Sequence, residues 1–311
     1  MSRAGAPIDA VLLIGFGGPE RAEDIRPFLD IVLRGRPVPP ARYEEVVHHY
    51  EEIGGRSPLN ELTFRQAAGL AAELRREGPD LPIHVGMRNW HPFIADTLAR
   101  MRDAGVRHAL GLILAPHRTE ASWERYADAV AAGQQALGAD APAITWASSW
   151  FDHPLFIETM AARTEAALAT LDGGAAAALV FTAHSIPTAM ARTSPYVAEL
   201  ETSARLVAAR LERTDWTLAY QSRSGSPRDP WLEPDVNEVL RDCAAAGTRA
   251  AVLVPIGFVC DHVEVLYDLD VEARTTAAAA GIRLARAQTA NDHPAFLRML
   301  ADVVRRDAAG E

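Results

Sequence analysis

The chain has 311 residues, of which 49% are hydrophobic and 23% are charged, so it has the balance of a globular protein rather than a disordered one. Its 31 Lys and Arg residues against 41 Asp and Glu residues give a formal net charge of −10, which argues against nucleic acid as a partner. No window offers the roughly 20 apolar residues that cross a bilayer, and the start lacks the pattern of a signal peptide. We therefore expect a cytoplasmic protein without integral membrane contact.

Short apolar runs alternate with longer amphipathic runs along the chain. The short runs predict strands at Val11–Phe16, Ile83–Met87, Ala109–Ala115, Ile144–Ser148, Ala177–Ala183, Thr217–Gln221, Ala250–Ile256 and Ile282–Ala287. The longer runs predict helices at Ala22–Leu33, Glu61–Arg76, Ile94–Ala104, Ser122–Ala136, Leu155–Leu171, Val197–Arg213, Pro234–Ala246 and His293–Arg306. This alternation predicts parallel sheets that helices cover on both faces.

The pattern of a strand followed by a turn starts twice, at 11–18 and at 177–187. It predicts an α/β protein with two Rossmann-like, doubly wound domains, which we expect at 1–150 and 151–311. The last predicted helix is a candidate to pack back on the first domain. Ligands of such folds bind at the carboxyl ends of the strands, so polar residues there are the candidates for function.

The first strand runs into the glycine-rich segment Gly15–Glu20. Glycines permit positive φ angles and a close approach of the backbone to a ligand. The third glycine of a dinucleotide fingerprint is missing, because Glu20 stands in its place. The motif alone favours a tight turn and leaves a ligand-binding turn open.

Two later segments each allow a structural and a functional interpretation. Arg34 lies in a basic stretch at 33–37, which fits a solvated loop or the recognition of carboxylates by guanidinium groups. Ser57 and Pro58 follow a glycine pair that is typical of a helix stop. Ser57 is expected to cap the next helix, and a contact with a ligand is the alternative.

His184 stands just past an apolar strand and before the turn Ser185-Ile186-Pro187. A lone histidine is more often structural than functional. Its place at the carboxyl end of a strand favours function, because histidine can exchange protons near neutral pH and can bind metals.

Three carboxylates follow another apolar strand at a spacing of four residues: Glu264, Asp268 and Glu272. On a helix they would form one acidic stripe, in which like charges repel. The stripe fits a solvated surface and a path that passes a hard cation along equally well.

These segments together resemble the ferrochelatase family over about 11–306. The resemblance rests on five segments in the same order: Gly15–Glu20, Tyr50–Leu59, Thr182–Pro187, Tyr220–Gly225 with Trp231–Val236, and Pro255–Glu272. The chain is most similar to the Gram-positive, actinobacterial type, with its F-G-G-P, R-N-W-H-P, A-H-S-I-P and P-I-G-F-x-x-D-H stretches. That type loads iron into coproporphyrin III, whereas the better-known branch uses protoporphyrin IX.

The resemblance implies a chelatase-like fold and a lyase that takes Fe(II) and a porphyrin as substrates and releases two protons. It implies that His184 and Glu264 are catalytic and that both contact the metal, together with Asp268 and Glu272 on a helix that the family distorts to the π form. It also implies porphyrin contacts at Phe16, Arg34, Tyr50, Ser57 and Ser222. Coproporphyrin III is the expected substrate, and protoporphyrin IX is the alternative.

The chain also departs from relatives at several positions. Phe16 stands where some relatives carry tyrosine, and His49 stands where some carry arginine. The two cysteines, Cys243 and Cys260, cannot supply the four thiolates of an ordinary iron–sulfur cluster. We therefore expect no iron–sulfur cluster, no permanently bound cofactor, and a monomer.

Two other classes of function stay open. A non-catalytic tetrapyrrole-binding protein would be expected to lose the pair of His184 and Glu264, which this chain keeps. A chelatase for another metal, such as cobalt, would be expected to show its own histidine pattern, and no second histidine stands in a matching turn.

Overall fold

A computed structural model of the protein describes residues 7–35, 38–172, 174–224 and 229–310. Residues 36–37 of the basic stretch and Gly225 lie outside the described residues. By its internal contacts the chain divides into two compact units. Unit 1 comprises residues 1–115, 120–150 and 292–311, and unit 2 comprises residues 116–119 and 151–291.

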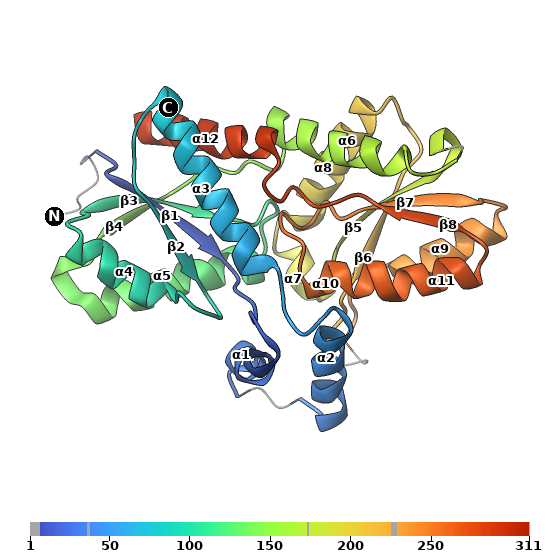
Figure 1. Cartoon of the computed structure of the whole chain (residues 1–311), viewed down its shortest axis with the longest axis horizontal. Helices are drawn as coiled ribbons and strands as arrows, with labels where there is room; N and C mark the ends of the chain where they lie inside the picture. The colour runs from blue at the N-terminus through green and yellow to red at the C-terminus, as the bar shows by residue number, and fades with distance from the viewer. Residues whose placement is uncertain (1–6, 36–37, 173, 225–228, 311) are drawn as a thin grey trace. The chain divides into compact units, whose positions relative to one another are not determined.

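Unit 1 is built on a parallel sheet of four strands in the order β2-β1-β3-β4. The strands are β1 Ala10–Gly15, β2 Ile83–Met87, β3 His108–Ile113 and β4 Ala143–Trp146. The helices that pack with them are α3 Leu59–Glu77, α4 Ile94–Asp103, α5 Arg125–Leu137 and α12 Pro294–Ala309. The α3–α12 pair and the α4–α5 pair lie on opposite faces of the sheet (Figure 1).

The core of unit 1 follows from the burial of β1 on both faces. Alternate side chains of a strand point to opposite faces, and every β1 residue is buried. Ala10, Leu12 and Ile14 pack with Leu98 of α4 and Val130 of α5. A central strand of this kind reads in the sequence as a continuous apolar run.

Two shorter helices precede α3 in unit 1. A 3₁₀ turn at Ala22–Asp24 leads into α1 Ile25–Leu33, and α2 Pro40–Glu52 follows. Both helices are amphipathic: α1 buries Ile25, Phe28 and Leu29, and α2 buries Val47 and Tyr50.

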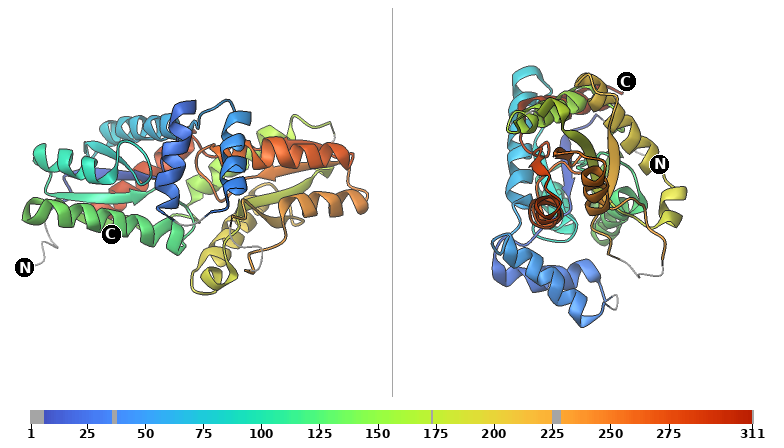
Figure 2. Two further views of the ribbon diagram at one scale, coloured as in Figure 1. Left: turned by 90° about the horizontal axis from the view of Figure 1, so that it is seen from below. Right: turned by 90° about the vertical axis from the view of Figure 1, so that its right-hand side faces the viewer.

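Unit 2 repeats the topology with a parallel sheet in the order β6-β5-β7-β8. Its strands are β5 Ala178–His184, β6 Thr217–Gln221, β7 Ala250–Val254 and β8 Arg283–Arg286. Its helices are α6 Pro154–Leu168, α7 Thr188–Arg192, α8 Tyr196–Arg210, α9 Val236–Ala245, α10 Val263–Leu266 and α11 Arg274–Ala279. Between α10 and α11 runs the π-helical segment η5, Asp268–Ala273. The three follow one another in the orange helical stretch of Figure 2.

The expected α/β class with parallel sheets is confirmed, and all eight expected strands are present with ends shifted by up to two residues. Two expected helices begin in another form: α1 after a 3₁₀ turn, and α5 after a π turn at Glu120–Glu124. No helix in the described part of the chain combines the length and the apolar composition of a membrane span.

The last helix, α12, returns to unit 1 after the chain has completed unit 2. Near its end, Asp307 accepts hydrogen bonds from the backbone N–H and the hydroxyl of Ser148, at 2.6 and 2.8 Å. Arg305 donates to the Gly78 carbonyl at 2.8 Å and the Glu73 carbonyl at 3.0 Å, at the end of α3. These bonds fix the C-terminal helix to unit 1, which also contains the N-terminal part of the chain.

Candidate active site

His184 is the last residue of β5, and it lies opposite Gln221, the last residue of β6. Its side chain is 30% exposed, although the strand before it is largely buried. The ring Nδ1 is hydrogen-bonded to the Ser185 carbonyl, so the neutral tautomer that fits carries its hydrogen on Nδ1. The lone pair of Nε2 is then available to accept a proton or to bind a metal.

Glu264 supplies the carboxylate that faces this ring. It lies in α10, whose first turn is capped by His262: the Nδ1 of that ring accepts from the Glu264 N–H at 3.1 Å. The Glu264 Oε1 atom lies 3.6 Å from His184 Nε2, and its side chain is 35% exposed. The Gln221 side chain donates to the Glu264 carbonyl, so the end of β6 holds the backbone of the carboxylate. The structure thus brings together His184 and Glu264, which lie 80 positions apart in sequence.

Asp268 follows in the π-helical segment, where the Glu272 N–H donates to the Tyr267 carbonyl five residues earlier, at 3.0 Å. Its side chain is 8% exposed. Burial, and to a smaller extent the neighbouring Glu264 and Glu272 charges, raise the pKa of Asp268 to about 8, against hydrogen bonds from Ser222 and Gln221 that lower it. Asp268 is therefore largely protonated at neutral pH.

Ser222 lies one residue after β6 with a φ of 62°. Its hydroxyl donates to Asp268 Oδ2, so in this structure the hydroxyl hydrogen is directed at the acidic segment. Among the residues that the structure describes, no group of three or more His, Cys, Asp or Glu side chains is arranged to hold an ion.

Phe16, in unit 1, follows β1 directly, and the residue is 37% exposed. Segment 88–89 continues the strand pairing beyond β1: the Arg88 N–H donates to the Gly15 carbonyl at 3.0 Å, and the Asn89 N–H donates to the Phe16 carbonyl at 2.9 Å. The Phe28 ring of α1 meets the Phe16 ring edge-on at 6.3 Å between centroids. An aromatic ring that is held by one edge-on contact and is partly exposed can lie against a flat ligand.

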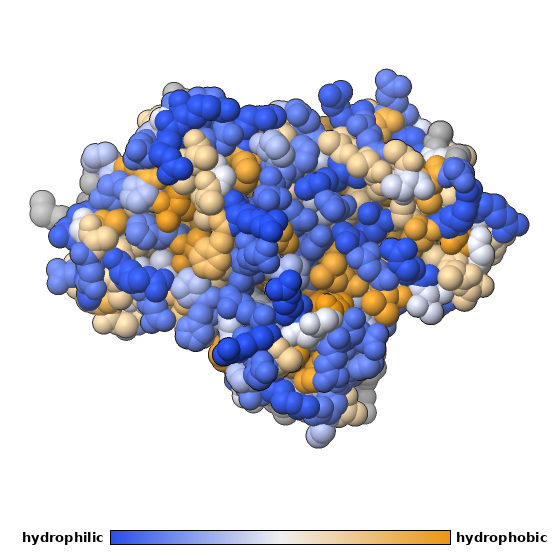
Figure 3. Space-filling view, in the orientation of Figure 1, coloured by the Kyte–Doolittle hydropathy of each residue, from blue (hydrophilic) through white to orange (hydrophobic). Residues whose placement is uncertain are grey.

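Phe28 also contacts two further aromatic rings. The centroids of Tyr50 and Trp90 each lie 6.1 Å from that of Phe28, in edge-on contacts. Tyr50 is 4% exposed, so in this structure it presents little surface to a ligand. Large exposed hydrophobic side chains in the described residues are Phe16 and Phe64, and the face seen in Figure 3 is mostly hydrophilic with small separate apolar patches.

Arg34 ends α1 in the left-handed region, at φ 48°, and is exposed. Its guanidinium donates to the Asn89 side-chain oxygen at 3.0 Å and to the Arg88 carbonyl at 3.3 Å. Segment 88–89, which is hydrogen-bonded to Phe16, therefore also orients the guanidinium of Arg34. Ser57 is 6% exposed, and its hydroxyl accepts from the Leu59 N–H at the start of α3. The N-cap residue of α3 is Pro58, so Ser57 lies one position before the cap and contributes this one bond to the first N–H of the helix.

His49, the residue before Tyr50 on α2, is a mostly enclosed histidine. Its side chain is 12% exposed, and burial lowers its pKa to about 4. The ring is therefore neutral at pH 7 and supplies no charge for a carboxylate.

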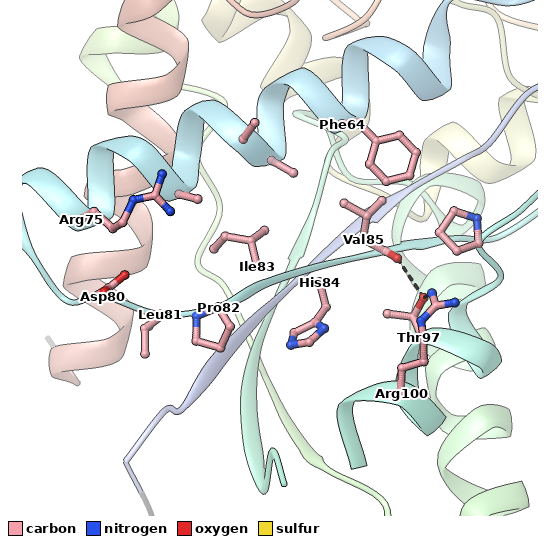
Figure 4. A pocket seen from close by; sticks show the side chains of 14 residues that line it. Phe64, Arg75, Asp80, Leu81, Pro82, Ile83, His84, Val85, Thr97 and Arg100 are labelled. Atoms are coloured by element: carbon pink, nitrogen blue, oxygen red, sulfur yellow. Dashed lines mark hydrogen bonds between the residues drawn. The ribbon is translucent and has the colours of Figure 1, made fainter. Parts of the chain in front are cut away.

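A separate pocket of about 500 Å³ lies in unit 1 beside the edge strand β2 (Figure 4). Arg75 of α3, Arg100 of α4 and His84 of β2 line it together with apolar side chains. The β2 edge is partly closed here, because the Val85 carbonyl accepts from the Thr97 hydroxyl at 2.8 Å. The residues described around this pocket include none of the predicted site residues, so it is distinct from the candidate active site.

Comparison with known proteins decides the family. The family description "Ferrochelatase" matches residues 8–308, nearly the whole chain. This chain belongs to the ferrochelatase family. The relationship that the short motifs indicated is therefore confirmed.

Two curated relatives of this ferrochelatase-family chain are named coproporphyrin III ferrochelatase. The protein of Mycobacterium tuberculosis (strain ATCC 25618 / H37Rv) is 46% identical over 299 residues, which cover 95% of this chain and 85% of that protein. The protein of Mycobacterium ulcerans (strain Agy99) is 45% identical over 305 residues, which cover 97% and 88%.

Two solved structures share the fold of this family member at low identity. SirB from Bacillus subtilis with Fe3+ has a TM-score of 0.61 and 12% identity, covering 97% of this chain and 96% of that one. DR2241 from Deinococcus radiodurans, described as similar to chelatases, has a TM-score of 0.57 and 16% identity, covering 96% and 55%. The expected chelatase-like fold is confirmed.

Several residues of the site in this ferrochelatase-family chain were missed from the sequence. Gln221 holds the Glu264 backbone, and the Tyr196 hydroxyl donates to the His184 carbonyl at 3.0 Å. Phe28 joins the predicted Phe16 and Tyr50. Gln221 ends an expected strand, so the rule that ligands meet strand ends could have singled it out. Phe28 and Tyr196 lie in helices, so the rule on strand ends does not apply to them.

Proposed function

We propose that this enzyme inserts iron(II) into coproporphyrin III, in the formation of haem. The observation that carries the proposal is the pair of His184 Nε2 and Glu264 Oε1 at 3.6 Å, at the carboxyl end of β5. The names of the mycobacterial relatives support coproporphyrin III as the porphyrin. Protoporphyrin IX is the alternative substrate within the family.

The reaction exchanges one iron(II) ion for the two N–H protons of the free porphyrin. Neutral His184 can accept a pyrrole proton at Nε2, because its Nδ1 hydrogen is directed at the Ser185 carbonyl. The Glu264 carboxylate can hold the incoming cation or stabilise the imidazolium that forms. Since burial keeps Asp268 largely protonated, its neighbour Glu264 faces less repulsion, and the acidic segment can pass protons by exchange.

We propose that unit 1 binds the porphyrin through two kinds of group. The exposed Arg34 guanidinium, aimed by Asn89, suits a propionate carboxylate. The exposed ring of Phe16 suits the flat face of the macrocycle. Tyr50 and Ser57 are proposed to contact the propionates as well. Ser222 is proposed to contact the porphyrin and also to hold Asp268, to which its hydroxyl donates a hydrogen bond.

The proposed setting is the cytoplasm, with iron(II) as a substrate and no resident cofactor. Neither Cys243 nor Cys260 forms a disulfide in this structure, which fits a reducing compartment. Porphyrin and iron(II) are the proposed partners, and the proposed state is a monomer.

His184→Ala and Glu264→Gln variants test the assignment of the pair. Both should fold and bind coproporphyrin III as the parent does, because both side chains are partly exposed, at 30% and 35%. Metallation should fall by at least about a hundredfold, the usual contribution of a general acid or base. The measurements are quenching of protein fluorescence by porphyrin and the anaerobic rate of iron insertion.

A Glu165→Gln variant on the exposed side of α6 serves as the matched control and should metallate at the parental rate. Full activity in His184→Ala would end the proposal that this histidine is catalytic. Loss of both porphyrin binding and folding in the variants would point to a structural role instead.

A further inference from the structure

Arg286, the last residue of β8, connects two aspartates that flank Glu264 in the sequence. Its Nε and Nη2 atoms donate to the two carboxylate oxygens of Asp270, at 2.8 and 2.7 Å. Its Nη1 atom donates to Asp261 Oδ1 at 3.1 Å. The Arg286 side chain is 11% exposed, against 14% for Asp261 and 25% for Asp270. One buried guanidinium therefore joins the loop before α10 to the π-helical segment η5.

The Asp261 end of this connection is fixed from a second direction. The Thr289 hydroxyl donates to Asp261 Oδ1 at 3.2 Å, and the Asn291 amide donates to Oδ2 at 3.2 Å. In return, the Asp261 N–H donates to the Asn291 side-chain oxygen at 3.0 Å. The loop that enters α10 is thus held by the segment that follows β8.

The segment between the two aspartates depends on such anchors. α10 has only four residues, and short helices are unstable alone. The π form that follows it is rarely adopted and must be held by tertiary contacts. Glu264 lies three residues after Asp261 and six before Asp270, so fixing both ends fixes the direction of its carboxylate.

Asp270 differs from Glu264 in its partner, because its charge is paired with that of Arg286. Asp270 makes a bidentate pair with Arg286 and a longer contact with Arg274, at 3.7 Å, whereas Glu264 faces His184. A buried ion network contributes conformational specificity more readily than net stability. Here the conformation that it specifies is the one that presents Glu264.

We propose that Arg286 is a positioning residue for iron insertion, which holds segment 261–270 so that the Glu264 carboxylate faces His184 Nε2. This inference rests on the proposed catalytic role of Glu264. Arg286 acts only through the backbone of that segment and touches neither substrate.

An Arg286→Lys variant tests the proposal, because lysine keeps the positive charge but lacks the planar fork that bridges two carboxylates. The kcat of iron insertion should fall at least about tenfold, because a small displacement of a catalytic group is costly. The KM for coproporphyrin III should stay within about twofold, and the pH profile of kcat should shift, since the distance between Glu264 and His184 changes. A merely structural role would lower the Tm and leave both kcat and the profile of the folded protein unchanged.

Arg283→Lys is the matched control. It lies on the same strand, its side chain is 54% exposed, and its contact with Asp172 is 3.9 Å long. It should behave as the parent does. A folded Arg286→Lys protein with the parental kcat and pH profile would overturn the proposal.

Asp270→Asn breaks the same connection from the other side and keeps the test decisive if the lysine variant does not fold. It should lower kcat in the same way, and the double variant should lose no more than the larger single loss, since both changes remove one interaction. Unchanged kcat in Asp270→Asn, or losses that multiply, would contradict the proposal. Glu264→Gln separates the two ideas: if it stays active, the catalytic assignment fails; if it is inactive while Arg286→Lys and Asp270→Asn are unaffected, only the positioning role fails.

Discussion

Asp268 lies between Glu264 and Glu272 on one acidic segment and is 8% exposed. Burial raises its pKa from an ordinary 3.8 to about 8, with smaller contributions from the two neighbouring carboxylates. A group that is neutral in the folded protein and charged in the unfolded chain makes stability depend on pH. Asp268 therefore links proton binding in the site to the free energy of unfolding.

The sign of this dependence follows from proton counting. Below an ordinary carboxyl pKa of 3.8 both states hold the Asp268 proton, and above about 8 both have lost it. Between these values the folded state holds a proton that the unfolded chain has released, so the free energy of unfolding falls as pH rises. An Asp268→Asn variant, which imitates the neutral acid, should lack this fall and gain on the parent between about pH 5 and pH 8.

Urea unfolding of both proteins at the two pH values measures the effect. Asp172→Asn, whose parent side chain is fully exposed, is the control and should differ from the parent by the same amount at each pH. A difference between Asp268→Asn and the parent that does not grow with pH would show that Asp268 is ionised in the folded protein.

At the residue scale the sequence could indicate His184 and Glu264, because each follows an apolar run and residues at strand ends meet ligands. It could not indicate Arg286, which ends β8, because its partners depend on strand order and on the path of the loop before α10. The role of Ser222 was also hidden, because its hydroxyl meets an acid 46 positions away.

At the scale of elements, the turn after β1 is the feature that places Phe16. Gly17 has a φ of 86°, and a Cβ atom at this position would lie 2.9 Å from both the backbone nitrogen and the Cβ of Trp90. The residue thus needs glycine twice, for its backbone angle and for the close approach of segment 87–90. The motif alone favoured a tight turn, and this geometry supplies the physical reason.

Gly17→Ala should destabilise unit 1 by at least about 2 kcal/mol, the sum of left-handed strain and overpacking. Gly105→Ala is a close control, since Gly105 has a φ of 85° and open space around its Cβ position. It should bear the backbone strain alone, about 1 kcal/mol. Urea unfolding compares the two variants, and equal losses would contradict the contact with Trp90.

The acidic segment shows what periodicity cannot reveal about an element. A spacing of i, i+4, i+8 predicts a stripe on an α-helix, whereas the structure continues α10 into a π-helix. The hydrogen bond from the Glu272 N–H to the Tyr267 carbonyl five residues earlier sets this form. The choice between α and π depends on contacts outside the segment, such as the pair of Asp270 and Arg286. The resemblance to the family, not the residue pattern, led to the π form.

At the scale of the whole molecule, alternating strands and helices were enough to predict two parallel sheets, because strands buried on both faces are continuous apolar runs. The shared strand order, β2-β1-β3-β4 and β6-β5-β7-β8, was beyond the sequence. Strand order depends on which helices cover which face of the sheet, and the sequence of an apolar run does not indicate which strand it pairs with. The bonds of Asp307 and Arg305 in α12 likewise join positions more than 150 residues apart.

Iron insertion into coproporphyrin III is followed by the anaerobic visible absorption spectrum after the protein, iron(II) and the porphyrin are mixed. The bands of the free porphyrin should give way to those of its iron complex, at a rate that falls at least about a hundredfold in His184→Ala. Protoporphyrin IX in the same assay should give a kcat/KM at least about tenfold lower, since the propionate groups that Arg34 suits are fewer. Two results would contradict the proposed function: a spectral change that is no faster with the protein than without it, or faster metallation of protoporphyrin IX than of coproporphyrin III.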